Sequence, residues 1–257
     1  MITHLVTSGC SFTDDSLHKN FNTWATYLNE ELNTEKHNYG LSSSGNGMIS
    51  KQALYGVNKL LTENVPAYNI LVGVMWSGPD RHETFIENTP VVVKDWKARK
   101  IPDYRIGIRN PYNFVEDDSA LNSWILQSAG WPDYHSQLYY THFWSKIGAQ
   151  IRTYENILRL QHYFDTVGVK YFFSSWCHST VDQDLIKNPN VSYLHDMINW
   201  NNWLPVVGEY EWCRDNTDLK FRENERDHSP KHPTPAMHEA FTHQVIIPFL
   251  NERNIIA

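Results

Sequence analysis

Short apolar runs alternate with amphipathic stretches along most of the chain. Residues 2–8, 68–76 and 169–176 are apolar runs of strand length, and residues 36–41 look like a further, shorter strand. A continuous apolar run is typical of a strand that is buried on both faces, as the strands of parallel sheets are. The pattern therefore predicts four strands, three of which lie in the interior of a sheet.

Apolar residues at helical spacing separate these runs. They predict helices at 21–32, 48–63 and about 138–166. A last helix is expected from Pro235 to about residue 251, because a threonine-proline pair suits the start of a helix. Strands and helices that alternate in this way predict an α/β fold, with a mainly parallel sheet covered by helices on both faces.

Two segments depart from the alternation, and neither divides the expected single domain, residues 1–257. Residues 80–135 contain four prolines and little periodicity. We expect them to form an insertion on the rim of the sheet that covers its carboxyl edge and shapes the substrate pocket. Residues 177–230 are predicted to be irregular. This second segment is rich in tryptophan: Trp200, Trp203 and Trp212.

Composition and charge limit the classes of ligand and partner that the chain is expected to bind. Aromatic residues make up 14% of the chain, which suits either a large core or a site that stacks on a flat ligand such as a sugar ring. The net charge of −7 argues against a broad nucleic-acid surface. No run approaches the ~18 apolar residues of a membrane span, and the N-terminus lacks the pattern of a signal peptide. We therefore expect a cytoplasmic protein without nucleic-acid or membrane partners.

The cysteines and histidines do not mark a metal site. The three cysteines, Cys10, Cys177 and Cys213, lie far apart and favour neither a disulfide framework nor a zinc site. The 13 histidines are scattered, without a convincing His-x-x-x-His pair on a helix beside acidic residues. We expect no metal and no organic cofactor.

Two short motifs carry residues suited to chemistry. Gly9-Cys10-Ser11 directly follows the first strand, and ligands of α/β sheets bind beyond the carboxyl ends of the strands. His232 lies at the other end of the chain, on a proline-rich turn that leads into the last helix. Each motif alone is also typical of an ordinary turn. Cys10, beside the serine, is a rival nucleophile.

Taken together, Gly-x-Ser near the start and His-Pro-Thr-Pro-x-x-His before the last helix resemble the SGNH (GDSL-like) hydrolase family. The resemblance implies a three-layer α/β/α sandwich with a flavodoxin-like sheet, in which Ser11 is the nucleophile and His232 the catalytic base. The loop Asn38–Asn46 looks like the family's second block, which supplies an oxyanion amide. The segment Val74–Arg81 stands where the third block usually ends in Gly-x-Asn-Asp.

The oxyanion hole departs from the family's pattern at two positions. Ser43 stands where the resemblance expects a glycine, with Gly45 two residues later. A backbone N–H donates equally from either residue type, so the expected donors are the amides of Ser11 and of Ser43 or Gly45. The family's asparagine donor is missing, and Ser77 is the nearest residue by position. Losing one such donor can cost on the order of 10²–10³ in rate.

The acid of the expected triad is displaced as well. The family's acid usually stands three residues before the histidine, where this chain has Ser229; Asp227 lies five residues before it. The catalytic set is therefore Ser11, His232 and Asp227, or a Ser–His dyad steadied by a backbone carbonyl. His228 is a rival base, disfavoured because the last helix begins directly after the His232 turn.

The expected activity is hydrolysis of an ester by a serine mechanism. Asn46, Trp76 and Arg81 are assigned to substrate binding; Arg81 could clamp an anionic group or form an ion pair with Asp80. The tryptophan-rich segments favour an O-acylated carbohydrate over a lipid as the small-molecule substrate. The alternative is a binding protein on the same fold, with a degraded site that recognises a carbohydrate or another small ligand. The sequence leaves the oligomeric state open.

Overall fold

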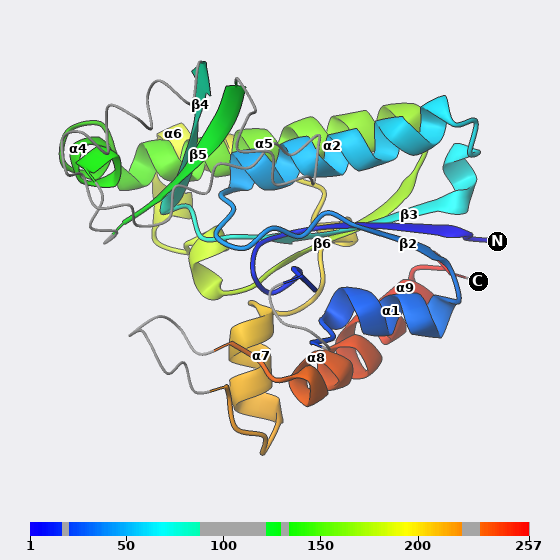
Figure 1. Ribbon diagram of the computed structural model, residues 1–257. Helices are drawn as coiled ribbons and strands as arrows, with labels where there is room; N and C mark the ends of the chain where they lie inside the picture. The colour runs from blue at the N-terminus through cyan, green and yellow to red at the C-terminus, as the bar shows by residue number, and fades with distance from the viewer. Residues whose placement is uncertain (17–20, 88–121, 130–133, 223–231, 257) are drawn as a thin grey trace.

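The structure, a computed structural model, describes residues 1–16, 21–87, 122–129, 134–222 and 232–256. A parallel sheet runs through its centre with helices on both faces (Figure 1). This arrangement is a three-layer α/β/α sandwich and confirms the predicted fold class. Within the described chain, no helix is long and apolar enough to cross a membrane.

The sheet has four parallel strands in the order β2-β1-β3-β6. That order matches the first four positions of a flavodoxin-like sheet. A single parallel bridge between Phe173 and Trp203 continues the sheet beyond β6. All four predicted strands are therefore found, with these bounds: β1 His4–Ser8, β2 Glu35–Asn38, β3 Ile70–Trp76 and β6 Lys170–Ser175.

Two groups of helices cover the sheet (Figure 1). Helices α2 (Asn46–Thr62) and α5 (Lys146–Val167) lie on one face. Helices α1 (Trp24–Leu32), α8 (Pro235–Phe241) and α9 (Ile247–Glu252) lie on the other. Each face has its own hydrophobic cluster, so the sheet is buried on both sides.

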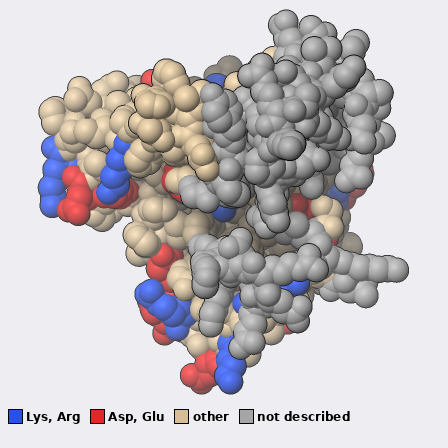
Figure 2. Space-filling view, turned by 60° about the vertical axis from the view of Figure 1, so that its left-hand side comes forward, with Lys and Arg blue, Asp and Glu red and all other residues tan. Residues whose placement is uncertain are grey.

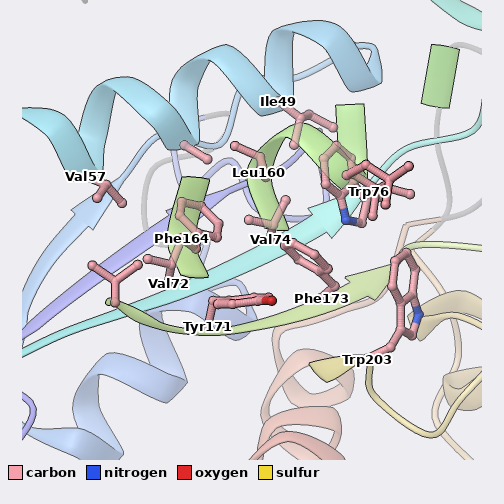
Figure 3. Packing of buried hydrophobic residues seen from close by; sticks show 14 of the residues in the cluster. Ile49, Val57, Val72, Val74, Trp76, Leu160, Phe164, Tyr171, Phe173 and Trp203 are labelled. Atoms are coloured by element: carbon pink, nitrogen blue, oxygen red, sulfur yellow. The ribbon is translucent and has the colours of Figure 1, made fainter. Parts of the chain in front are cut away.

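Strand β3 explains why its sequence is a continuous apolar run. Val72 and Val74 point to the α2/α5 side, where they pack with Leu160 (Figure 3). Leu71 and Met75 belong to the cluster on the opposite face. Because neighbouring side chains of a strand point to opposite faces, a strand with two buried faces needs apolar residues at every position.

Two predicted helices are interrupted. The expected helix at 138–166 is two helices, α4 (Tyr134–His142) and α5, because the chain turns at Ser145. The Ser145 hydroxyl accepts a hydrogen bond from the Gly148 amide at 3.0 Å and caps α5. The last predicted helix contains a π-helical segment, Thr242–Ile246, between α8 and α9.

The described part of segment 177–230, residues 177–222, is more regular than the sequence suggests. It contains helices α6 (Pro189–Met197) and α7 (Glu209–Asn216) among shorter helical turns. Its tryptophans contribute to the hydrophobic clusters: Trp203 is buried on the α2/α5 side, Trp200 packs beside it, and Trp212 packs against the cluster on the other face. The prediction of irregular structure was wrong because short helices carry too few turns for a clear periodicity.

The described part of segment 80–135 is an antiparallel hairpin of β4 (Arg81–Glu87) and β5 (Asn122–Ser128), followed by the start of α4. The hairpin touches the start of α2: a Cβ on Gly45 would lie 2.9 Å from the Arg81 carbonyl oxygen. The start of α2 follows the loop after β2, so this contact is at the carboxyl edge of the sheet. Residues 88–121 and 130–133 of the expected insertion lie outside the described residues.

Candidate active site

Ser11 lies on the turn that directly follows β1. The amides of Thr13 and Asp14 both donate to the carbonyl oxygen of Cys10, at 2.9 and 3.1 Å, and close this turn. The Ser11 side chain is only 6% exposed, and its Oγ lies 2.7 Å from Nε2 of His232. The two residues are 221 positions apart in the sequence, so the contact is a product of the fold.

His232 precedes α8, as its motif predicts. Thr234 is the N-cap of this helix, with Pro235 in the first turn. The His232 carbonyl oxygen accepts a hydrogen bond from the Arg222 amide at 3.0 Å. The imidazole packs against Phe12, with ring centroids 5.0 Å apart. Backbone and ring are thus both held, and the ring can serve as a base in the tautomer that leaves Nε2 unprotonated.

Cys10 does not compete with Ser11 in this geometry. Its side chain is fully buried and belongs to the hydrophobic cluster on the α1/α8 side. Successive residues of the turn thus point in different directions: the thiol points into the core and the hydroxyl points to His232. The thiol therefore acts as a small apolar side chain here.

The loop after β2 offers two unengaged backbone amides. The Ser42 amide donates to the Asp14 carboxylate at 2.8 Å, and the Ser44 amide donates within the loop at 3.1 Å. In contrast, the amides of Ser43 and Gly45 have no acceptor among the described residues. Ser43 has φ = 71°, in the left-handed region that favours glycine. The serine thus adopts a conformation in which the glycine of the resemblance would be unstrained.

A polar network that the sequence analysis did not identify fixes this loop against the Ser11 turn. The Asn38 amide group donates to the Thr13 carbonyl oxygen at 2.7 Å and to the Asp15 carboxylate at 2.6 Å. Gly40 lies so close that a Cβ on it would be 2.5 Å from the Thr13 carbonyl carbon. A side chain at position 40 would therefore separate the two loops.

Asp15 is the charged centre of this network. Burial alone would raise the pKa of Asp15, but hydrogen bonds from Thr23, Asn38 and Lys36 outweigh it, and the pKa lies below its ordinary value of 3.8. Thr23 donates from its hydroxyl at 2.6 Å, and the Lys36 ammonium lies at 3.0 Å. The carboxylate form is therefore part of the folded structure.

Asn46 holds the loop after β3 in place and is not directed at a substrate. Its Oδ1 accepts from the Ser77 amide at 2.7 Å, and its Nδ2 donates to the Ser77 carbonyl oxygen at 2.9 Å and to Thr153 Oγ1 at 3.0 Å. The expectation that Asn46 binds substrate does not fit this geometry, because both ends of its amide group are engaged. Ser77 Oγ is buried and has no hydrogen-bond partner among the described residues.

Of the two other residues assigned to substrate binding, Trp76 lies in the core and Arg81 lies beside the loop after β2. Trp76 is fully buried on the α2/α5 side, beside Phe173 (Figure 3), so it packs in the core and cannot meet a substrate there. The Arg81 guanidinium donates to the Ser44 carbonyl oxygen at 3.5 Å. Arg81 thus remains next to the loop that carries the unengaged amides, while the Asp80 carbonyl oxygen accepts a hydrogen bond from Tyr140.

Asp227, the expected acid, and His228, the rival base, lie outside the described residues, as does Ser229. The described ends of that segment are joined by the Arg222–His232 backbone hydrogen bond. The structure therefore defines the contact between Ser11 and His232, and the acid remains an expectation from the sequence.

His238, the second histidine of the His-Pro-Thr-Pro-x-x-His motif, is paired with Glu209. His238 Nδ1 lies 2.6 Å from Oε1 of Glu209, and both side chains are buried. Burial raises the pKa of Glu209, and the charge of His238 opposes that shift. The pair joins α7 to α8, directly behind Phe12, whose ring lies 6.3 Å from that of His238. Sequence spacing gave no signal for it because the partners come from different helices.

The face in Figure 2 bears acidic and basic side chains close to one another. Contacts such as Arg214–Asp215, at 2.6 Å, and Lys146–Asp182, at 2.7 Å, pair opposite charges on the described surface. The described part of this face therefore has no extended patch of one sign.

Fold and site together define a parallel α/β sandwich with a Ser–His pair where the first strand ends. No family model matches the sequence, and no curated protein matches it. Among solved structures, the chain is similar to a protein described as a "putative lipolytic protein of G-D-S-L family" from Desulfitobacterium hafniense DCB-2. The identity is 13%, the TM-score is 0.43, and the match covers 94% of this chain and 96% of that one.

Proposed function

We propose that this chain is a serine ester hydrolase in which Ser11 is the nucleophile and His232 the general base. The observation that carries the proposal is the 2.7 Å contact between Ser11 Oγ and His232 Nε2. An imidazole at this distance can take the hydroxyl proton as the oxygen attacks an ester carbonyl. It then returns the proton to the leaving alcohol, and water attacks the acyl enzyme by the same route.

The oxyanion of the tetrahedral intermediate needs donors that are not otherwise engaged. We assign this role to the amides of Ser11, Ser43 and Gly45, since none of them has an acceptor among the described residues. The buried hydroxyl of Ser77, also without a partner there, is the fourth candidate donor. Fixed donors of this kind stabilise charge as it develops, because they need no reorganisation during the reaction.

Asp227 is proposed as the acid that orients His232, and a Ser–His dyad is the alternative. The proposed substrate is the ester of a small molecule. Part of the preference for an acylated carbohydrate depends on Trp200, Trp203 and Trp212, which pack in or against the hydrophobic clusters. An acetylated sugar is therefore one substrate to be tested and has no special support. The proposed reaction requires no metal or organic cofactor.

The test is hydrolysis of short-chain nitrophenyl esters, together with labelling by a fluorophosphonate. The wild-type protein should turn over the ester and be labelled. Ser11→Ala should lose turnover by a factor on the order of 10⁴ or more and escape labelling. Its melting temperature should change little, since one hydrogen bond contributes about 1 kcal/mol. Ser192→Ala, on α6, is the matched control and should behave as wild type.

Two results would contradict the proposal. Turnover retained in Ser11→Ala would move the nucleophile elsewhere in the chain. A wild-type protein that neither cleaves esters nor reacts with the fluorophosphonate would favour the second candidate function, a binding protein on the same fold. One observation favours the binding-protein function: the family's asparagine donor after β3 is missing, and this chain has Ser77 there.

A further inference from the structure

Three side chains with metal-binding chemistry meet at the start of the first two strands. His4 opens β1, and Glu35 and His37 belong to β2. The parallel register pairs His4 with Glu35 and Val6 with His37. Alternate residues of a strand share a face, and Val6 packs in the cluster under α2 and α5. All three side chains therefore lie on the α2/α5 side of the sheet.

Their ligand atoms have the spacing of a metal site. One nitrogen from each histidine and one carboxylate oxygen lie within 4.8 Å of one another. His4 Nε2 is 3.5 Å from Glu35 Oε2, and His37 Nε2 is 3.4 Å from Glu35 Oε1. Tetrahedral zinc, with bonds of about 2.0–2.1 Å, holds its ligand atoms about 3.4 Å apart. The two histidine–carboxylate separations, each to a different oxygen of Glu35, are close to the edge of such a tetrahedron.

The two imidazoles are oriented for binding by what surrounds them. Nδ1 of His4 lies 2.8 Å from the Thr3 hydroxyl, so Nε2 is the nitrogen that faces the carboxylate. Metal-binding histidines commonly use their second nitrogen in this way. Nε2 of His37 is buried and makes no hydrogen bond among the described residues. The two rings are stacked, with centroids 5.5 Å apart and planes 13° from parallel.

Ordinary ion pairing is a weaker account of the same cluster. The two histidine–carboxylate contacts measure 3.5 and 3.4 Å. Charge-assisted hydrogen bonds between a nitrogen and a carboxylate oxygen are shorter, about 2.7–2.9 Å. Glu35 is also mostly exposed, and an exposed ion pair contributes little to stability.

We propose that His4, Glu35 and His37 bind a zinc ion. Two imidazoles and one carboxylate suit this metal, and a water molecule would complete the tetrahedron. The site ties the edge strand β2 to β1 at their amino ends, whereas Ser11 follows the carboxyl end of β1. Zinc here stabilises the fold, because a ligand that binds only the folded state shifts the unfolding equilibrium. It takes no part in ester hydrolysis.

The experiment is titration of the chelator-treated full chain with Zn²⁺, followed by calorimetry and by thermal unfolding. The wild-type protein should bind zinc and show a higher melting temperature with zinc than without it. His37→Ala and Glu35→Gln should each weaken the binding by at least about tenfold, since even the loss of an outer partner costs 10–100-fold. His243→Ala is the control, because that histidine lies near a carboxylate at 3.9 Å but forms no three-residue cluster in the described chain.

The melting temperature of each variant without zinc separates folding from binding. His37→Ala should unfold near the wild-type temperature in the absence of metal and lose only the increase that zinc produces. Ester hydrolysis by the wild type should be the same with and without bound zinc. Zinc affinity in His37→Ala and Glu35→Gln equal to that of the wild type would overturn the proposal. Absence of zinc binding by the wild type would overturn it too.

Discussion

Asn46 holds Ser77 by both backbone polar groups of that residue, the amide at 2.7 Å and the carbonyl oxygen at 2.9 Å. Asn46 begins α2, directly after the loop with the unengaged amides, and Ser77 directly follows β3. Thr180, after β6, donates to the same Ser77 carbonyl oxygen at 3.0 Å. The loops that follow three strands are thereby locked to one another on the carboxyl side of the sheet.

Asn46→Asp should weaken this lock. The substitution replaces the Nδ2 donor with an oxygen that faces the Ser77 carbonyl oxygen, so an attraction becomes a repulsion. We expect a loss of about 1–3 kcal/mol in the free energy of unfolding, the usual cost of a buried polar group without its partner. Denaturant unfolding measures it. Asn201→Asp, on an exposed turn, is the control, and an equal loss in both variants would contradict the prediction.

Ser11 and His232 should behave as one catalytic unit. Ser11→Ala and His232→Ala should each abolish most of the ester hydrolysis, and the double variant should be hardly slower than either single variant, because the residues act together. The measurement is kcat/KM for the four proteins at one pH. If the losses multiply in the double variant, the two residues contribute independently and the unit is refuted.

Ser43 should tolerate glycine and reject a β-branched residue. At φ = 71°, glycine relieves strain but adds flexibility to the unfolded chain, so Ser43→Gly should change stability by less than about 1 kcal/mol. Its kcat/KM should be retained, since the proposed donor is the backbone amide. Ser43→Val should be clearly destabilised. Loss of turnover in Ser43→Gly at unchanged stability would show that the side chain itself is used.

Asp15 should make the free energy of unfolding depend on pH in acid solution. Its folded-state pKa lies below the ordinary value of 3.8, owing to bonds from Thr23, Asn38 and Lys36 that outweigh burial. The carboxylate therefore stabilises the fold fully above that value, and the contribution is lost as the pH falls through the lower folded pKa. Asp15→Asn should be destabilised at pH 7, with a smaller difference from wild type below pH ~3.8. Urea unfolding across this range measures it.

The exposed Asp184→Asn variant is the control for the acid prediction, and it should follow the wild-type profile. A constant difference between Asp15→Asn and the wild type across the whole range would contradict the assigned role of the carboxylate.

The fold was predictable where a strand is buried on both faces, because such a strand shows as a continuous apolar run in the sequence. β3 is apolar at each position because it faces two helical layers, and Gly168 ends α5 in the left-handed conformation that glycine favours. The break before α5 was not predictable from apolar spacing, since the capping hydroxyl of Ser145 is a local polar contact. Helices α6 and α7 are too short to show a clear helical periodicity in the sequence.

Only the part of the site that lies in two recognisable motifs, those of Ser11 and His232, was predictable from the sequence. The Ser11 and His232 motifs lie toward opposite ends of the sequence, and the fold brings them together. The hydrogen bonds of Asn46 to the Ser77 backbone were not predictable, because polarity in a loop does not reveal whether a side chain faces a ligand or a neighbouring backbone. The His4–Glu35–His37 cluster escaped a search for helical histidine spacing, because it is formed across two parallel strands.

The two edges of the four-stranded sheet differ from open strands that could pair with another molecule. An open edge strand can recruit a strand from another molecule, and short, charged or covered edges prevent this. β2 has only four residues and begins with Glu35 and Lys36, which are both exposed. At the opposite edge, the Leu204 amide donates to the Phe173 carbonyl oxygen at 2.9 Å and occupies a site where a foreign strand would attach. Both borders of the described four-stranded sheet thus carry features that disfavour pairing with a foreign strand.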